Sequence, residues 1–233
     1  MSANDGFLKA VIQAFSETVR IKMEQLYRVV PKNTNSDLTG AFVEEMVRGF
    51  IRDWVSPCQL LQGTLHPHHS NSQLSEEKSR PKQIDGLVFD PRRGPAIIRE
   101  GNFLVAHPLF CRGVIEIKTS CNNLTGFEER LQSLYCQYFE PFYPSFFSGV
   151  VENEIMGVVI QDSNPEKTSN PAHLQHPLYK YDGGSHCPIF ILFKVSDGIY
   201  EPYVPAIEAM IRAVFLSNWQ GDNRHERADI YRP

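Results

Sequence analysis

Hydrophobic residues recur every three or four positions in four segments of the chain, which is the spacing of one face of an α-helix. These segments cover residues 5–30, 38–55, 125–139 and 204–216. Pro31 and Pro57 follow the first two segments, and proline ends a helix because it lacks the backbone N–H and clashes with the preceding turn. The pattern therefore predicts four amphipathic helices.

Shorter apolar runs lie between these helices and predict strands at 59–65, 83–89, 113–118, 155–161 and 189–195. Residues 96–98 and 103–106 predict a small hairpin around Glu100-Gly101-Asn102. The order is helix, three strands, helix and strand, with additions at both ends. Local antiparallel pairs followed by a crossover helix predict a mixed sheet.

We therefore expect an α/β (α+β) fold with a central mixed sheet of four to five strands flanked by helices. The length of 233 residues suits one domain over 1–233. Within it, residues 1–35 are expected to form an N-terminal helical extension. Residues 187–218 are expected to add a strand and a helix at the C-terminal end.

Composition narrows the class of protein. With 42% hydrophobic and 21% charged residues, the chain resembles ordinary globular proteins and not disordered ones. No apolar run approaches the roughly 20 residues that span a bilayer, and no secretory signal pattern opens the chain. Five widely spaced cysteines without a CxxC pair favour reduced thiols and a cytoplasmic location. The net charge of −4 disfavours non-specific coating of nucleic acid, although a local basic groove is compatible with it.

Acidic residues in apolar strands are the main chemical signal. Asp85 lies within Ile-Asp-Gly-Leu-Val-Phe, and Glu116 and Lys118 lie within Gly-Val-Ile-Glu-Ile-Lys. Side chains alternate along a strand, so Glu116 and Lys118 share one face. Burying a carboxylate is costly unless a cation or hydrogen bonds compensate, and Mg²⁺ prefers oxygen ligands. The pattern predicts a divalent-metal site with a lysine beside it, placed to act on water or on phosphate charge.

Simpler interpretations exist for each residue. An acid-x-Lys triplet also occurs at Glu76-Glu77-Lys78, in a polar segment expected to be a loop. Asp85 could end a strand or pair with an arginine, and Glu116 with Lys118 could form a surface ion pair. Glu44 could be a solvated helix residue. The order of elements around the acids favours the metal site over these alternatives.

These residues resemble the PD-(D/E)XK, or restriction-endonuclease-like, superfamily. Its core is helix, three strands, helix, strand, with an acid on the second strand, acid-x-Lys on the third and often a glutamate on the first helix. Asp85 matches the first acid, and Glu116 with Lys118 matches the second element. The resemblance covers about residues 38 to 161 and is closest to uncharacterised bacterial and phage-associated members with Gln-Ile-Asp and Glu-x-Lys-Thr/Ser strands. Ile84 stands where the superfamily name pattern has proline.

The resemblance implies a set of metal ligands. Asp85, Glu116 and the backbone carbonyl of Ile117 would bind Mg²⁺ or Mn²⁺. Glu44 would bind the ion directly or through water. Helical spacing favours Glu44 over Glu45 as the glutamate that points toward Asp85.

The resemblance also implies an activity. Lys118 would act on the attacking water, and Gln83, two residues before Asp85, would orient water or phosphate. The expected function is a Mg²⁺-dependent endonuclease or exonuclease that hydrolyses phosphodiester bonds in DNA, in defence or mobile-element biology. The alternative is a catalytically inactive nuclease-fold module that senses nucleic acid or contacts a protein partner. A protein partner could also supply specificity to the enzyme.

Other residue groups carry weaker signals. The histidines after the first strand could bind zinc, but a polar loop is the simpler interpretation. Residues 182–186 contain a serine in a Gly-rich turn that lacks the strand-turn-helix setting of a nucleophile. An aromatic cluster could stack on bases or join the core, and arginines near the hairpin could contact phosphates in a binding module. The residues concerned are His66, His68, His69, Ser185, Phe139, Phe142, Tyr143, Phe146, Phe147, Arg92, Arg93 and Arg99.

Overall fold

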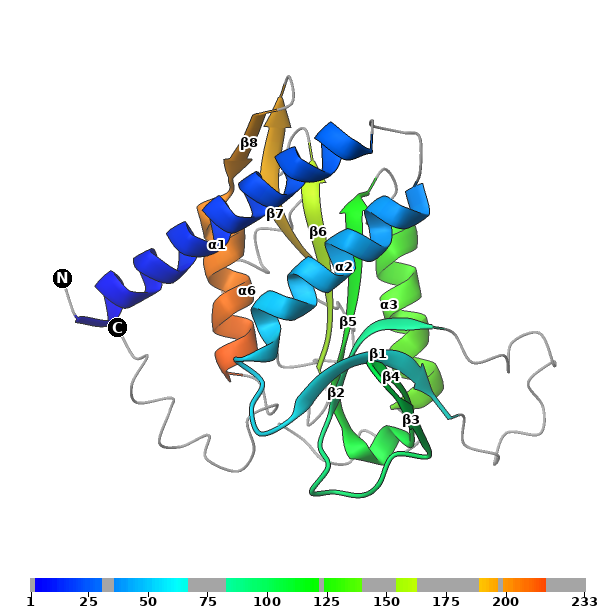
Figure 1. Ribbon diagram of the computed structural model, residues 1–233. Helices are drawn as coiled ribbons and strands as arrows, with labels where there is room; N and C mark the ends of the chain where they lie inside the picture. The colour runs from blue at the N-terminus through cyan, green and yellow to red at the C-terminus, as the bar shows by residue number, and fades with distance from the viewer. Residues whose placement is uncertain are drawn as a thin grey trace.

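The computed structural model of the chain describes residues 3–30, 36–66, 83–121, 124–139, 154–162, 189–196 and 199–216 (Figure 1). Its α-helices in these ranges are α1 (Ala3–Val29), α2 (Ser36–Arg52), α3 (Leu124–Tyr138) and α6 (Val204–Leu216). A short 3₁₀ turn, η1 (Pro108–Phe110), precedes one of the strands. All four helices expected from the apolar spacing are therefore present, with bounds that differ by at most three residues.

The strands form one sheet. They are β1 (Gln59–Leu65), β2 (Ile84–Phe89), β3 (Ile98–Glu100), β4 (Phe103–Ala106), β5 (Cys111–Ser120), β6 (Glu154–Asp162), β7 (Ile189–Ser196) and β8 (Ile199–Pro202). Their order is β3-β4-β1-β2-β5-β6-β7-β8. β1, β2 and β5 pair antiparallel, whereas β5, β6 and β7 run parallel to one another. The expected mixed sheet flanked by helices is confirmed.

The sheet is wider than the expected four to five strands because elements join both of its edges. The hairpin of β3 and β4 adds to one edge, where β4 pairs parallel with β1. Gly101 has a φ of +55° and makes the hairpin turn, a conformation that glycine adopts without strain. The strand β8 pairs with β7 at the other edge. Of its four residues only Tyr200 is buried, so β8 lacks the apolar run that identifies a strand.

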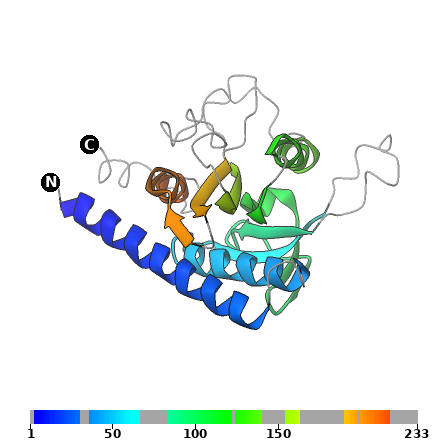
Figure 2. The same ribbon diagram turned by 90° about the horizontal axis from the view of Figure 1, so that it is seen from above.

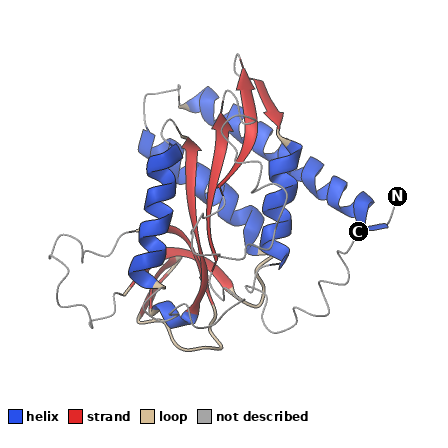
Figure 3. Cartoon of the chain, turned by 180° about the vertical axis from the view of Figure 1, so that it is seen from behind, coloured by secondary structure: helices blue, strands red, loops and turns tan. Residues whose placement is uncertain are grey.

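Helices cover both faces of the sheet. Figure 2 shows α1 and α2 side by side on one face and α3 on the opposite face. In the view from behind, α3 lies on the near side of the molecule and runs alongside the long strands (Figure 3). Phe15, Val19 and Met23 of α1 pack into the same core as residues of α2, β5 and β7. The first helix thus supplies core side chains, while the division of the chain into a core domain with extensions stays a prediction.

The position of α3 depends on a close approach to the sheet. Phe127 of α3 lies over β6, and a Cβ added at Gly157 would come within 2.7 Å of the Phe127 ring. Leu131 and Leu134, one and two turns further along α3, are buried in the same core as Ile155 and Val159 of β6. This packing fixes the helix that bears Arg130 against β6, the strand that pairs with β5.

Two further expectations concern the whole molecule. No helix in the described ranges has both the length and the apolar character needed to cross a bilayer. Of the cysteines that the structure describes, Cys58, Cys111, Cys121 and Cys136, none forms a disulfide. Cys187 lies outside the described residues.

Candidate functional site

The two strands that carry the predicted acids are neighbours in the sheet. β2 pairs antiparallel with β5, and Gly86 lies opposite Ile115 while Leu87 lies opposite Val114. Extending this register by one residue places Asp85 opposite Glu116. Residues directly opposite in an antiparallel pair project their side chains to the same face. The strand pairing therefore brings the two carboxylates together on one face of the sheet.

Asp85 is buried and held by a backbone donor. Only 7% of its surface is exposed, and its Oδ2 accepts a hydrogen bond from the Ile117 N–H at 2.8 Å. Burial raises the pKa of Asp85, while this hydrogen bond and the nearby charges of Lys118 and Arg130 act in the opposite direction. The carboxylate is thus aligned against β5 and only partly compensated in charge.

Glu116 is the most deeply buried acid of the site. Its side chain is 0% exposed, and its Oε2 accepts a hydrogen bond from Arg130 Nε at 2.8 Å. The other oxygen, Oε1, is buried without a hydrogen-bond donor among the described residues. Burial raises the pKa of Glu116 to about 7; Arg130 opposes the rise and the Asp85 charge adds to it. A buried carboxylate oxygen without a partner is costly, so this atom is open to a cation.

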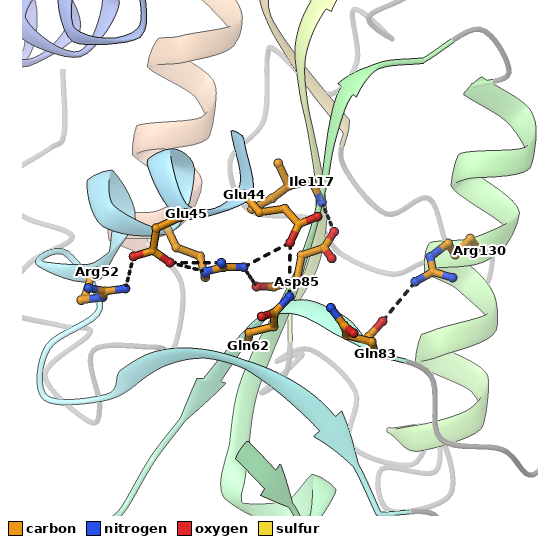
Figure 4. Close-up of polar contacts among 9 residues, drawn as sticks. Glu44, Glu45, Arg52, Gln62, Gln83, Asp85, Ile117 and Arg130 are labelled. Atoms are coloured by element: carbon orange, nitrogen blue, oxygen red, sulfur yellow. Dashed lines mark hydrogen bonds and ion pairs between the residues drawn. The ribbon is translucent and has the colours of Figure 1, made fainter. Parts of the chain in front are cut away.

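Figure 4 shows that Glu44 points toward Asp85 and that Glu45 points away from it. Gln62 Nε2 donates to Glu44 Oε2 at 3.3 Å, and Arg48 Nη1 lies 3.6 Å from the same oxygen. Burial raises the pKa of Glu44, and the Asp85 charge raises it further. Glu45 instead accepts hydrogen bonds from Arg48 Nε and Nη2. The orientation of the two glutamates matches the helical spacing.

Lys118 and Gln83 border the carboxylates. Lys118 is exposed and forms no hydrogen bond or ion pair within the described part of the chain, yet its charge lowers the pKa of Asp85, Glu116 and Glu44. The backbone carbonyl of Gln83 accepts a hydrogen bond from Arg130 Nη2 at 3.2 Å. Lys118 is therefore a cation near the acids that is not committed to any one of them.

Two arginines of the site were not predicted from the sequence. Arg48 is buried, and its Nη1 donates to the Asp85 carbonyl at 2.6 Å, which fixes β2 against α2. Arg130 reaches Glu116 from α3. Signals for both were present, since Arg48 follows Glu44 by four residues and Arg130 is adjacent to Leu131 on the buried stripe of α3. Charged residues beside an apolar stripe are usually solvated, which is why the sequence did not single them out.

The donor set fits a hard divalent cation through the two strand acids. Among the described residues, no three His, Cys, Asp or Glu side chains are arranged as a metal-binding group. The unpartnered Oε1 of Glu116, with Asp85 opposite and Glu44 nearby, nevertheless offers carboxylate oxygens of the kind that Mg²⁺ and Mn²⁺ bind. The Ile117 carbonyl, predicted as a further ligand, belongs to the same stretch of β5. The roles of these residues stay predictions.

Some residues with weaker signals lie in the described part of the chain, and others lie outside it. His66 directly follows β1. Phe139 is fully buried, so it belongs to the core and offers no ring for base stacking. The remaining histidines and aromatics of those two groups and the Ser185 turn lie outside the described residues. Arg92 binds Asp90 through Nε at 2.8 Å, and Arg93 Nη1 donates to the Leu109 carbonyl at 3.4 Å. Arg99 lies on the edge strand β3.

Comparison with solved structures identifies a shared fold. The chain is similar to NucC of P. aeruginosa ATCC27853 in its cAAA-bound form, with a TM-score of 0.56 and 12% sequence identity over 89% of this chain and 90% of that chain. It is also similar to cAAA-bound NucC of E. coli MS115-1, with a TM-score of 0.54 and 13% identity over the same shares of the two chains. No protein-family model and no curated protein sequence matches the chain. The likeness spans nearly the whole chain and shows that it has a NucC-like, nuclease-like fold.

Proposed function

We propose that this protein is a metal-dependent nuclease that hydrolyses phosphodiester bonds in DNA. One observation carries the proposal: Asp85 and Glu116 share one face of two adjacent strands, and Glu116 Oε1 is buried without a partner among the described residues. Lys118 lies two residues beyond Glu116 on the same strand face. The nuclease-like fold shared with NucC and the resemblance to PD-(D/E)XK enzymes support the same activity.

In this proposal the acids hold the cation and the basic residue acts on the reactants. Asp85 and Glu116 bind Mg²⁺ or Mn²⁺, with the Ile117 carbonyl and Glu44 completing the ligand set. The bound cation supplies Lewis-acid stabilisation of charge on the phosphate. Lys118, exposed and within electrostatic range of all three carboxylates, orients the attacking water and stabilises the charge that develops in the transition state. Gln83 orients water or phosphate at the edge of the site.

A cleavage assay tests the proposal. Plasmid, linear and single-stranded DNA are incubated with the protein and Mg²⁺ or Mn²⁺, with and without cAAA, because both NucC structures hold that ligand. The variants are Glu116→Ala, Lys118→Ala and, as a control on an exposed ion pair of α1, Arg20→Gln. We expect Glu116→Ala to lose both cleavage and metal binding. Lys118→Ala should lose cleavage but keep metal binding, and Arg20→Gln should match the wild type.

Two outcomes would contradict the enzyme. Cleavage that survives in both Glu116→Ala and Lys118→Ala would mean that another site or a contaminant cuts the DNA. A wild type that binds Mn²⁺ yet leaves every substrate intact would favour the alternative, a nuclease-fold module that binds nucleic acid or a protein partner. In that case arginines near the hairpin such as Arg99 should govern the salt dependence of DNA binding.

A further inference from the structure

Arg130 is held between the acid site and solvent. Its Nε donates to Glu116 Oε2 at 2.8 Å. Its Nη2 donates to the Gln83 carbonyl at 3.2 Å, as Figure 4 shows. The Arg130 side chain is 33% exposed, whereas that of Glu116 is 0% exposed. Of the five N–H donors of a guanidinium, these contacts use two. The others have no partner among the described residues.

Arg130 compensates the negative charge of Glu116, and a divalent metal ion would compensate that charge more strongly. A buried carboxylate is costly without a compensating partner, and among the described residues Arg130 is the cation in direct contact with Glu116. A dication bound by Asp85 and by the other oxygen of Glu116 places positive charge next to the guanidinium, repels it, and neutralises the carboxylate charge that attracts Arg130. Metal binding therefore weakens the electrostatic attraction between Arg130 and Glu116.

The geometry of Arg130 suits a second partner. The planar guanidinium matches two oxygens of a phosphate, and its charge is retained at any physiological pH. The side chain extends from α3 across the edge of the site at Gln83, where it is partly exposed. A phosphate brought to a metal on Asp85 and Glu116 would thus lie within the range of a released Arg130.

We propose that Arg130 is a phosphate-binding residue of the nuclease site, held by Glu116 in the metal-free protein and transferred to a phosphate of the DNA when the metal binds. This inference rests on the proposed function, because it assumes that Asp85 and Glu116 bind the cation. It assigns to α3 a direct role in substrate binding that the strand motif does not contain.

Metal binding tests the first half of the inference. Mn²⁺ is titrated into the wild type, Arg130→Gln and Lys118→Gln without DNA, and the dissociation constant is measured by calorimetry. Arg130→Gln should bind Mn²⁺ about tenfold more tightly, because the metal no longer displaces a charge-assisted contact. Lys118→Gln also removes a positive charge near the site but breaks no contact with Glu116, so its gain should be about twofold or less.

DNA binding tests the second half. Binding of a short duplex is measured over a range of salt concentrations with Ca²⁺, a hard oxygen-binding cation, in wild type, Arg130→Gln, Arg130→Lys and Arg20→Gln. Losing one phosphate contact should lower the magnitude of the slope of log K against log salt by about 0.9 in Arg130→Gln. Arg130→Lys keeps the charge and should retain most of the slope. Arg20→Gln should leave the slope unchanged.

The outcomes separate this inference from the proposed function. Equal gains in Mn²⁺ affinity for Arg130→Gln and Lys118→Gln, or weaker binding by Arg130→Gln, would overturn the displacement of Arg130 by the metal. An unchanged salt slope in Arg130→Gln would overturn its contact with phosphate. In both cases wild-type Mn²⁺ binding leaves the proposed metal site standing. A wild type that does not bind Mn²⁺ would remove both proposals. If Arg130→Gln does not fold, Arg130→Met, which keeps an apolar stem and removes the charge, provides the same measurements.

Discussion

The protonation of Glu116 gives the site a specific pH dependence. Its ordinary pKa is 4.5, and burial raises it to about 7 in the folded protein, against the opposing effect of Arg130. Below pH 4.5 the group is neutral in both the folded and unfolded states, so it has no effect on stability. Between pH 4.5 and 7 the unfolded state ionises first, and the free energy of unfolding of the metal-free protein falls as pH rises. Above pH 7 the full penalty is present.

The size of this penalty follows from the two pKa values. A difference of about 2.5 pH units between 4.5 and 7 corresponds to about 3 kcal/mol. Glu116→Gln removes the titration while keeping an oxygen that can accept the hydrogen bond from Arg130. The stability of Glu116→Gln relative to the wild type should therefore rise by about 2.5 kcal/mol between pH 5 and pH 8.

Urea unfolding in the presence of a chelator measures the difference. Wild type and Glu116→Gln are unfolded at pH 5, 6, 7 and 8, and the free energies are subtracted at each pH so that groups common to both proteins cancel. Mn²⁺ should then stabilise the wild type at pH 8 and not the variant, because a ligand that binds only the folded state adds to stability. A difference between the two proteins that stays constant from pH 5 to 8 would refute the buried, high-pKa Glu116 on which this reasoning depends.

Two further predictions concern charge and packing outside the site. Asp90 is buried between Arg92 and Arg112, and its hydrogen bond from Arg92 lowers its pKa to about 2. Asp90→Asn should cost about 3 kcal/mol in urea unfolding at pH 7. The cost should shrink as pH falls from 3.8 toward 2, where the wild type also loses the charge; a cost that is equal at pH 3 and pH 7 would contradict this pairing. On α1, Phe15 is 2% exposed and Phe7 is 56% exposed. Phe15→Ala should cost about 3 kcal/mol or more, and Phe7→Ala should cost about 0.5 kcal/mol or less; equal costs would show that α1 does not belong to the core.

Most of the fold could be predicted because its elements have regular apolar patterns. The strand β7 is a continuous apolar run, and this run identifies it directly. The helix α3 is identified by its buried stripe of Phe127, Leu131, Leu134 and Tyr138. The strand β8 has no such run, since Ile199 is exposed and only Tyr200 is buried. Pairing with β7 and contacts with the core stabilise β8. Local sequence does not encode that tertiary support, so β8 is the strand that the apolar patterns do not predict.

The acids of the site could be predicted for a related reason. Asp85 and Glu116 interrupt apolar strands, and a carboxylate within a buried strand requires a compensating partner. What the strand pattern could not reveal is the identity of that partner. Glu116 contacts Arg130, which is 14 residues away along the chain and on another element. The simpler interpretation weighed for Asp85, pairing with an arginine, thus describes a contact of Glu116.

The hydrogen bonding of Glu116 bears on the choice between a metal-binding carboxylate and a purely structural partner of Arg130. Glu116 has two oxygens, of which Oε2 accepts from Arg130 and Oε1 has no donor in the described part of the chain. If Arg130 were a purely structural partner, a second donor for the buried Oε1 would be expected, since structural ion pairs in interiors are stable only when their remaining hydrogen-bonding capacity is satisfied. A buried oxygen without a hydrogen-bond donor is retained more readily where it binds a ligand. The half-satisfied state of Glu116 therefore argues for a cation at Oε1 and for Arg130 as a partner that can be exchanged.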